Sequence, residues 1–279
     1  MNNELWHRRG ILRLAAGLAG ATTAVAAAGP AFGRQAVPGR QAVPGRLANG
    51  SARPPVTGRL AGRDVEKLPI TEKEVALTFD CGSSPDGVDA VLATLREHGL
   101  PATFFMTGRF AQDHTEAARR VARTHPVGNH SMTHPPFTRL THEQRVTEIR
   151  SAARAVEEAT GRPPVPLFRF PFGDVDRQCV ADVNDEGYTC VRWTVDTLGW
   201  KGATGGATTA TVTGRVLRAL TPGTIVLMHV GRTSPADPST VDATALPHLI
   251  KAVDDQGYGF TSLDALVAEA GDAAGGRPR

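Results

Sequence analysis

The chain has 279 residues, of which 41% are hydrophobic and 21% are charged, so it is long enough to bury a sizeable core. Its 31 lysines and arginines against 28 aspartates and glutamates give a net charge of only +3. No basic stripe with interleaved aromatic residues occurs, so nucleic acid is not expected as a partner.

The N-terminus predicts an export signal over residues 1–28. Arg8 and Arg9 precede an apolar run that extends from Ile11 to Ala28 and is interrupted only by Arg13. This pattern fits a twin-arginine signal or an ordinary secretory signal. We therefore expect a protein that is secreted or associated with the cell wall after cleavage. An uncleaved membrane anchor is the weaker alternative, because the run is rich in alanine and glycine.

Residues 29–63 have the composition of a linker. The hexapeptide at 34–39 is repeated at 40–45, and proline, glycine, arginine and alanine dominate without hydrophobic periodicity. A tether or a passive spacer is the expected role. A folded domain is then predicted over residues 64–271, followed by a flexible tail at 272–279.

Short apolar runs alternate with longer amphipathic stretches throughout the predicted domain. The predicted strands are 75–79, 102–106, 126–128, 167–170, 189–195, 224–228 and 258–261. The predicted helices are 86–98, 112–124, 142–160, 174–186, 209–220, 243–256 and 262–270. This alternation indicates an α/β fold, namely a single-domain (β/α) barrel of about seven parallel strands.

Titratable side chains recur at or just beyond the ends of these strands. They are Asp80, His130, Arg169, Asp196 and His229. In a parallel barrel the carboxyl ends of the strands share one face, and active sites lie there. The sequence therefore predicts one site that is built from five separate segments.

Two of these segments suggest particular chemistry. His130 and His134 are spaced i and i+4, so on one helical turn they would point the same way and could share a metal ion. Arg169 suits a forked hydrogen bond that orients a carboxylate such as Asp80. Taken singly, each has an ordinary alternative: a chance histidine pair and a surface arginine.

Three cysteines allow at most one intramolecular disulfide. Cys179 and Cys190 are the better pair if a helix and the following strand place them at a similar height; two free buried thiols are the alternative. Cys81 is left unpaired.

Five motifs together resemble the polysaccharide deacetylases with a NodB-like domain, carbohydrate esterase family 4. In chain order they occupy residues 78–82, 130–134, 169–173, 196–200 and 227–229. The resemblance implies a distorted (β/α) barrel and a divalent metal, with zinc expected first and cobalt or another transition ion as alternatives. It also implies that water attacks an N-acetyl group.

The resemblance assigns a role to each motif residue. Asp80 would be the general base, His229 the general acid, and Arg169 the residue that holds Asp80. Substrate would be bound by the backbone N–H of Phe172, by Leu227 and Trp200 as walls of the acetyl pocket, and by Asp196. The metal ligands would be His130, His134 and Cys81.

Two positions depart from the family pattern. Cys81 stands where the family has a metal-binding Asp, and Gly199 stands where it has an Asp that supports the acid histidine. Cys81 could ligate as a thiolate, water or a side chain such as Ser83 or Asp86 could complete the site, or the site could be metal-free and inactive. Without an acid at 199, His229 is expected to be less basic unless Asp196 or Asp80 reaches it.

The function expected from this resemblance is an exported N-deacetylase. Peptidoglycan is the first substrate to expect, followed by chitin oligomers and O-acetylated xylan. The alternatives are a non-catalytic wall-binding module and a cysteine hydrolase using Cys81. Nothing in the sequence suggests an obligate protein partner, so a monomer is expected.

Overall fold

The computed structural model describes residues 53–232 and 236–268. The predicted export signal, residues 29–52 of the predicted linker and the predicted tail lie outside these ranges. Within them, no helix combines the length and the apolar character needed to cross a membrane.

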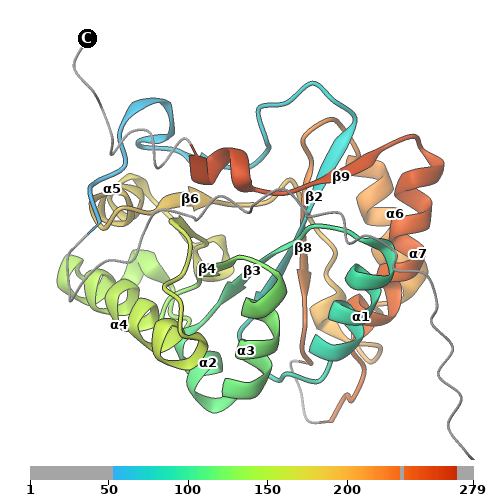
Figure 1. Ribbon diagram of the computed structural model, residues 1–279, viewed down its shortest axis with the longest axis horizontal. Helices are drawn as coiled ribbons and strands as arrows, with labels where there is room; N and C mark the ends of the chain where they lie inside the picture. Colours follow the sequence, from blue (N-terminus) through green and yellow to red (C-terminus); the bar gives the residue numbers. More distant parts are fainter. Residues whose placement is uncertain (1–52, 233–235, 269–279) are drawn as a thin grey trace, which may run out of the picture. The chain divides into compact units, whose positions relative to one another are not determined.

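The strands form one curled sheet with helices around it (Figure 1). In the described residues the strands are β1 (Asp64–Val65), β2 (Glu74–Cys81), β3 (Thr103–Met106), β4 (Val127–Asn129), β5 (Leu167–Phe168), β6 (Thr189–Val191), β7 (Val195–Asp196), β8 (Ile225–His229) and β9 (Gly259–Thr261). Their order is β1-β6-β5-β4-β3-β2-β8-β7, with β9 paired to β2, and every one of these pairs is parallel. The predicted parallel α/β barrel is therefore confirmed as a curled, incompletely closed form.

The two ends of the sheet are linked by the segment between β6 and β7. The backbone N–H of Arg192 donates to the carbonyl of Val65 in β1, and that of Thr194 donates to the carbonyl of Ile225 at the start of β8. The predicted strand 189–195 is therefore two short strands at opposite ends of the sheet. Strand β1, only two residues long, was not predicted.

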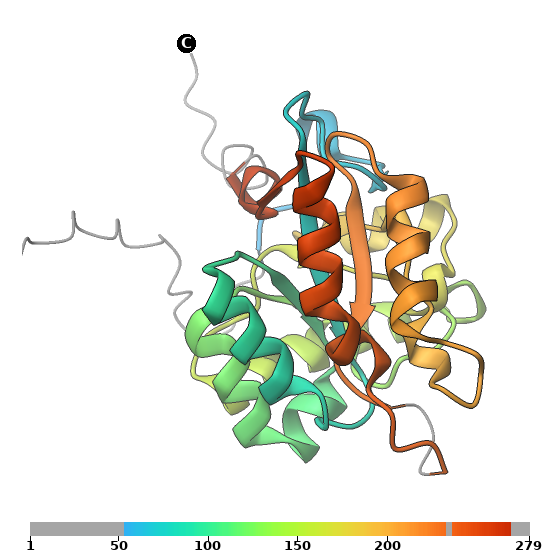
Figure 2. The ribbon, with the colours of Figure 1, turned by 90° about the vertical axis from the view of Figure 1, so that its right-hand side faces the viewer.

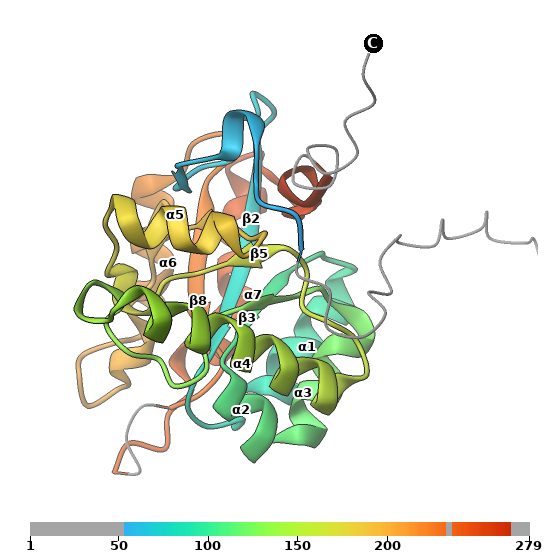
Figure 3. The same ribbon diagram turned by 90° about the vertical axis from the view of Figure 1, so that its left-hand side faces the viewer.

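The helices cover the outside of the sheet. They are α1 (Val88–His98), α2 (Gly108–Asp113), α3 (Thr115–Thr124), α4 (His142–Thr160), α5 (Arg177–Asp185), α6 (Thr209–Ala219) and α7 (Val241–Asp255). Helices α6 and α7 run side by side next to β8 (Figure 2), and α4 packs on α5 (Figure 3).

Capping explains where the sequence-based boundaries succeed and where they fail. Helix α4 has the predicted bounds, because Thr141 and Gln144 form a capping box and Gly161 ends the helix in the left-handed region. The predicted helix 112–124 is instead two helices. The Thr107 side chain caps α2, and the backbone leaves the helical region at His114.

The side chains of strand β2 alternate between the two faces of the sheet. Val75, Leu77, Phe79 and Cys81 belong to the apolar core between the sheet and its helices. The alternate residues face the inside of the curl, because successive side chains on a strand point to opposite faces. Asp80 is therefore directed into the curl.

Residues 53–63, which were predicted as linker, pack against the domain. Val56 and Leu60 are buried in a core cluster on the inner side of the sheet. The backbone N–H of Val56 donates to the Asn184 carbonyl at 2.9 Å, and the Arg53 guanidinium lies 4.6 Å from the centre of the Tyr188 ring. The packed region thus begins before Asp64.

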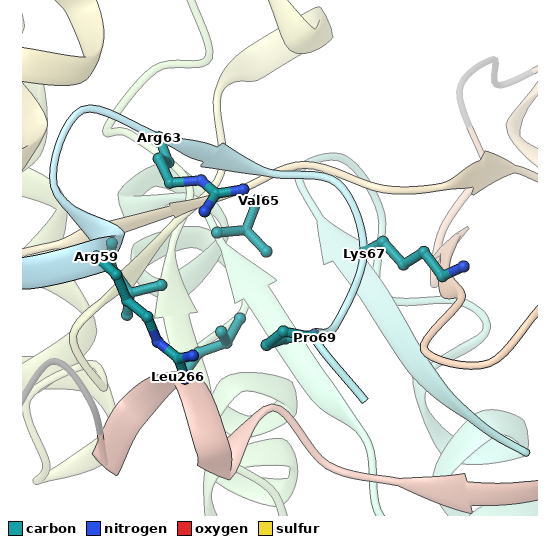
Figure 4. Close-up of a pocket in the computed structure, with 7 residues that line it drawn as sticks. Arg59, Arg63, Val65, Lys67, Pro69 and Leu266 are labelled. Atoms are coloured by element: carbon teal, nitrogen blue, oxygen red, sulfur yellow. The ribbon is translucent and has the colours of Figure 1, made fainter. Parts of the chain in front are cut away.

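A cavity of about 60 Å³ lies between the β1 segment and Leu266 (Figure 4). Arg59, Arg63 and Lys67 are among its lining residues. It is well below the size of a typical ligand pocket, which is roughly 300–1,000 Å³.

All three cysteines are free and buried. Cys179 of α5 and Cys190 of β6 share one apolar cluster, and burial raises the pKa of Cys179 to about 11. In the structure Cys179 and Cys190 are therefore two free buried thiols and do not form a disulfide.

Candidate active site

A pocket of about 500 Å³ lies where β2 and β8 end. Its lining residues are Asp80, Gly82, Ser83, His130, His134, Phe170, Phe172, Trp193, Asp196, Trp200, Leu227, His229 and Gly231. The structure thus brings together all of the predicted site residues except Arg169, which lies behind the pocket wall, and Cys81. This convergence follows from the parallel sheet, whose strands all end on one side.

Asp80 lies at the centre of this site. Its Oδ1 accepts a hydrogen bond of 2.8 Å from Arg169 Nη1, and its Oδ2 lies 3.3 Å from His130 Nε2. In the β2–β8 pairing it stands opposite His229. Burial alone would raise the pKa of Asp80, but His130, Arg169 and His229 together hold this pKa below its ordinary value. Asp80 is therefore an ionised carboxylate that can accept a proton.

Arg169 is fully buried and uses its donors on three different acceptors. Nη1 donates to Asp80, Nε to the Val191 carbonyl at 3.2 Å, and Nη2 to the Arg192 carbonyl at 3.0 Å. The guanidinium also lies 4.0 Å from the centre of the Phe105 ring. The predicted forked hydrogen bond to Asp80 is therefore wrong: one donor reaches the carboxylate, and the other two anchor the arginine to the backbone.

The segment that carries His130 and His134 is a loop, so the predicted helical turn is also wrong. Ser131 and His134 have φ of 65° and 63°, in the left-handed region. Asn129 Oδ1 accepts from the backbone N–H of Ser131, and Ser131 Oγ accepts from that of His134. These side chains satisfy donors that a helix would have used, and Pro135 disfavours a helical residue before it.

Glu148 of α4 fixes the middle of this loop. Its carboxylate accepts from the backbone N–H groups of Met132 and Thr133, both at 2.8 Å, and from the Thr133 hydroxyl at 2.7 Å. No sequence pattern predicts this contact, because Glu148 is an ordinary polar position within an amphipathic helix.

The loop nevertheless brings the two imidazoles together, with ring centroids 4.8 Å apart. His130 Nδ1 lies 2.8 Å from the Arg169 carbonyl, which can only accept, so Nδ1 carries the proton and Nε2 has a free lone pair. Burial lowers the pKa of His130; burial, together with His130, lowers that of His134 to about 4. Both rings are neutral at neutral pH.

These two rings fit a divalent transition ion in donor chemistry. His130 Nε2 and Asp80 Oδ2 are two acceptors that face each other across 3.3 Å, which is an arrangement that a nearby cation stabilises. The orienting contact of His130 Nδ1 with a backbone carbonyl is also usual for a metal-binding histidine. Within residues 53–232 and 236–268, however, no group of three or more His, Cys, Asp or Glu is arranged to hold an ion.

Cys81 does not join the histidines. Its side chain is fully buried in the outer core with Phe79 and Met106, on the opposite face of β2 from Asp80. Burial, and then the charge of Asp80, raise the pKa of Cys81 well above its ordinary value, so it stays a thiol. This placement gives no support to Cys81 as a metal ligand.

The other two suggested substitutes are engaged elsewhere. Asp86 forms an ion pair with Arg232 at 2.7 Å, and the Ser83 hydroxyl donates to the Arg232 carbonyl at 2.8 Å. Only Ser83 lines the pocket.

Asp196 organises one wall of the pocket. Its Oδ1 accepts from the backbone N–H of Leu198 at 2.8 Å, and its Oδ2 lies 3.4 Å from Trp200 Nε1. Leu227 is paired with Asp196 between β7 and β8. Leu227 and Trp200 both line the pocket, and the ring centroids of Trp200 and His229 are 6.5 Å apart.

Phe172 forms part of the opposite rim. It has a left-handed φ of 59°, its side chain is 68% exposed, and its ring packs edge-on against His134 at 4.5 Å. An exposed aromatic ring at the mouth of the pocket offers an apolar surface to a ligand.

His229 has a buried carboxylate partner that sequence reasoning missed. Asp242 Oδ2 accepts from the backbone N–H of His229 at 2.9 Å and lies 3.6 Å from His229 Nδ1. Burial would lower the pKa of His229, but Asp242, Asp80 and Asp196 raise it above its ordinary value. The weakly basic His229 expected from Gly199 is therefore not found. Asp242 adjoins the predicted helix 243–256, and nothing in its spacing pointed to the site.

Comparison with known proteins gives a consistent set of relatives. The sequence profile of the polysaccharide deacetylase family matches residues 67–191. The chain is 34% identical over 200 residues to a peptidoglycan-N-acetylglucosamine deacetylase of Listeria monocytogenes, a match that covers 71% of this chain and only 40% of that protein. It is 35% identical over 202 residues to a chitooligosaccharide deacetylase of a Bradyrhizobium species, covering 70% of this chain and 90% of that one.

Among solved structures, the fold is similar to that of a family 4 carbohydrate esterase pseudoenzyme from Bacillus anthracis. The TM-score is 0.67 at 28% identity, over 75% of this chain and 70% of the other. A mutant of that pseudoenzyme, described as having restored enzymatic activity, superposes equally well, with a TM-score of 0.67.

Proposed function

We propose that this chain, which belongs to the polysaccharide deacetylase family, is a hydrolase that removes N-acetyl groups from the amino sugars of a polysaccharide. The observation that carries the proposal is the pairing of Asp80 with His229 across one pocket, with two neutral imidazoles beside them. An ionised acceptor and a basic imidazole at the ends of adjacent strands are the two proton-transfer groups that amide hydrolysis needs.

Asp80 accepts a proton from the attacking water as oxygen adds to the acetyl carbon. Its pKa, held below the ordinary value despite burial, keeps the carboxylate ionised before the attack. Arg169 fixes the carboxylate from behind through Oδ1, which leaves Oδ2 on the side of His130. The base is therefore oriented by a residue that is itself anchored to two backbone carbonyls.

His229 donates a proton to the departing nitrogen as the carbon–nitrogen bond breaks. Its raised pKa favours the protonated imidazole, which is the form that a general acid requires. The products are a free amino sugar and acetate. The backbone N–H of Phe172 is the group proposed to hold the developing oxyanion.

His130 and His134 would hold a divalent transition ion, zinc first and cobalt as an alternative. The chemistry such an ion supplies is polarisation of the acetyl carbonyl and a lowered pKa of the attacking water. Their neutral rings are suited to it, and Cys81 is not included among the proposed ligands.

Leu227 and Trp200 are proposed to enclose the acetyl methyl group, with Asp196 orienting the indole. Peptidoglycan is the proposed first substrate and chitin oligomers the second, because relatives with these two names are 34% and 35% identical to the chain over 200 and 202 aligned residues. A cell-wall substrate agrees with the predicted export signal, so we place the mature protein outside the cytoplasm.

The test is acetate release from purified peptidoglycan and from chitin oligomers. The protein is first stripped with a chelator and then assayed with zinc, with cobalt or with no ion added back. We expect acetate from at least one substrate, and an increase when the ion is restored. No acetate from any combination would reject the proposed activity.

A second function is favoured by one specific observation. Cys81, at the position of the family's metal-binding Asp, is a thiol buried in the core. In addition, one of the solved structures with a similar fold is a family 4 pseudoenzyme. The alternative is a non-catalytic wall-binding protein. It predicts that the chain sediments with peptidoglycan but releases no acetate with any added ion.

A further inference from the structure

Gly199 is not required by its backbone. It does not lie in the left-handed region, where glycine is favoured, so any residue could adopt its conformation. What excludes a side chain is Asp242. A Cβ at position 199 would lie 2.1 Å from Asp242 Oδ1 and 2.3 Å from its Cγ, far inside contact distance. The Asp242 carboxylate therefore occupies the space into which a side chain at 199 would project.

The same carboxylate contacts the proposed acid. One oxygen, Oδ2, accepts from the backbone N–H of His229 at 2.9 Å and faces Nδ1 of the same residue at 3.6 Å. The other, Oδ1, accepts from the Thr197 hydroxyl at 2.7 Å. Asp242 is only 2% exposed, so this geometry is set by packing.

We propose that Asp242 is the positioning residue for His229: from α7 it supplies the carboxylate that a side chain at position 199 would otherwise supply. This inference rests on the proposed role of His229 as general acid. His229 Nδ1 forms no hydrogen bond within the described residues, but it is buried and faces this carboxylate, which leaves Nε2 as the nitrogen that can give a proton to the departing amine.

The location of Asp242 suits a buried negative charge. It is the second residue of α7, a helix that begins at Val241, where the positive end of the helix dipole stabilises an anion. Thr197, two residues before Gly199, completes its hydrogen bonding. Asp242 thus links α7 to Thr197, which follows β7, and to His229 at the end of β8.

Other charges also face His229. Asp80 comes from β2 and Asp196 from β7, and both raise its pKa, while the imidazoles of His130 and His134 lie in the same pocket. A test must therefore separate Asp242 from these neighbours, all of which are unchanged when Asp242 alone is altered.

The first variant is Asp242→Asn, with Asp254→Asn on the exposed side of the same helix as the control. The pKa of His229 is read directly by NMR titration of its ring protons. We expect it to fall in Asp242→Asn and to be unchanged in Asp254→Asn. The alkaline limb of the kcat/KM profile should move to lower pH, with at least about a 10-fold loss at pH 8 and little change in KM.

The second variant moves the carboxylate from position 242 to position 199. Gly199→Asp alone should be poorly folded, because two carboxylates would compete for one space. Gly199→Asp combined with Asp242→Ala should recover a high pKa of His229 and most of the activity lost in Asp242→Ala. This double variant also decides the question if Asp242→Asn does not fold.

An unchanged pKa of His229 in a folded Asp242→Asn protein would overturn the inference. So would a Gly199→Asp protein with wild-type stability. The NMR titration needs no substrate, so a wild-type protein that releases no acetate would reject the proposed function and still leave the role of Asp242 to be decided.

Discussion

Asp80 and Cys81 are adjacent in the chain but belong to different parts of the molecule. The sequence predicts a strand that ends at Phe79, which would place both residues on the open rim. Strand β2 instead continues to Cys81, so alternation turns Asp80 into the pocket and Cys81 into the core. The strand is two residues longer than predicted, and this difference places Asp80 in the pocket and Cys81 in the core. The ends of strands are the part of a fold that sequence patterns predict least well.

Cys81→Ala tests this separation. Because the thiol lies in the core, we expect zinc affinity within about 2-fold of wild type and a loss of about 1 kcal/mol in the free energy of unfolding from the lost packing. Isothermal titration calorimetry with zinc and urea unfolding give the two values. His130→Ala, which removes a proposed ligand, is the positive control. A loss of affinity of 10-fold or more in Cys81→Ala would show that the thiolate ligates after all.

At the scale of elements, the loop at residues 130–134 shows that a motif can be recognised correctly while its secondary structure is predicted wrongly. The spacing of His130 and His134 predicts a shared ligand, and the rings do meet. They meet through a left-handed loop, however, whose donors are satisfied by Asn129, Ser131 and Glu148. Glu148 is distant in sequence, and only the packing of α4 brings it to the loop.

Glu148→Gln should loosen the loop and weaken metal binding by about 10- to 100-fold, because partners that orient ligands contribute effects of that size. The control is Glu158→Gln, an exposed position on the same helix. Zinc affinity of the apo-protein is the measurement. Equal affinities for the two variants would mean that Glu148 does not hold the ligands in place.

Helix α4 forms a buried ion pair with α5 and a partly exposed one with Glu186, the C-cap residue of α5, which makes a matched comparison. Arg145 Nε lies 2.5 Å from Asp182 Oδ2, with the Asp182 side chain only 1% exposed. Arg150 Nε lies 2.7 Å from Glu186 Oε2, and the Arg150 side chain is 56% exposed. Asp182→Asn should cost about 3–5 kcal/mol because it leaves a buried charge uncompensated. Glu186→Gln should cost about 1 kcal/mol or less.

The buried pair also predicts a dependence on pH. Burial would raise the pKa of Asp182, but hydrogen bonds from Gln178, Arg145 and His142 lower it below its unfolded value. A lowered folded-state pKa stabilises the protein above the unfolded pKa of about 4, and this contribution is lost as pH falls through the folded value. Urea unfolding should therefore show a smaller difference between wild type and Asp182→Asn at pH 3 than at pH 7. An equal difference at both values would contradict the assignment.

At the scale of the whole molecule, the alternation of strands and helices was sufficient to predict a parallel α/β barrel. Strand β1 is missing from the prediction, and β7 is merged with β6 in the predicted strand 189–195. Strands β1 and β7 have two residues each, too few to show a periodicity, whereas the equally short β5 lies within the apolar run 167–170. The same reasoning explains residues 53–63, whose linker-like composition conceals the buried side chains of Val56 and Leu60.

Two truncations test this boundary. A chain that begins at Arg53 keeps every contact described for residues 53–63 and should unfold near the wild-type temperature. A chain that begins at Asp64 loses the burial of Val56 and Leu60, each about 1.5–3 kcal/mol at most, and should be less stable by about 2–4 kcal/mol. Thermal unfolding followed by circular dichroism compares them. Equal midpoints would show that residues 53–63 are only a linker.

The central claim is that Asp80 acts as the base of a deacetylase. The most direct measurement is acetate release from chitin oligomers and peptidoglycan by zinc-loaded wild type, by Asp80→Asn and by Asp113→Asn, an exposed aspartate on α2 that serves as the control. Asn at position 80 can still accept the hydrogen bond from Arg169, so the fold should be retained. We predict full activity for Asp113→Asn and a loss of about 10²- to 10⁴-fold for Asp80→Asn. Activity of a folded Asp80→Asn protein within 2-fold of wild type would contradict the claim.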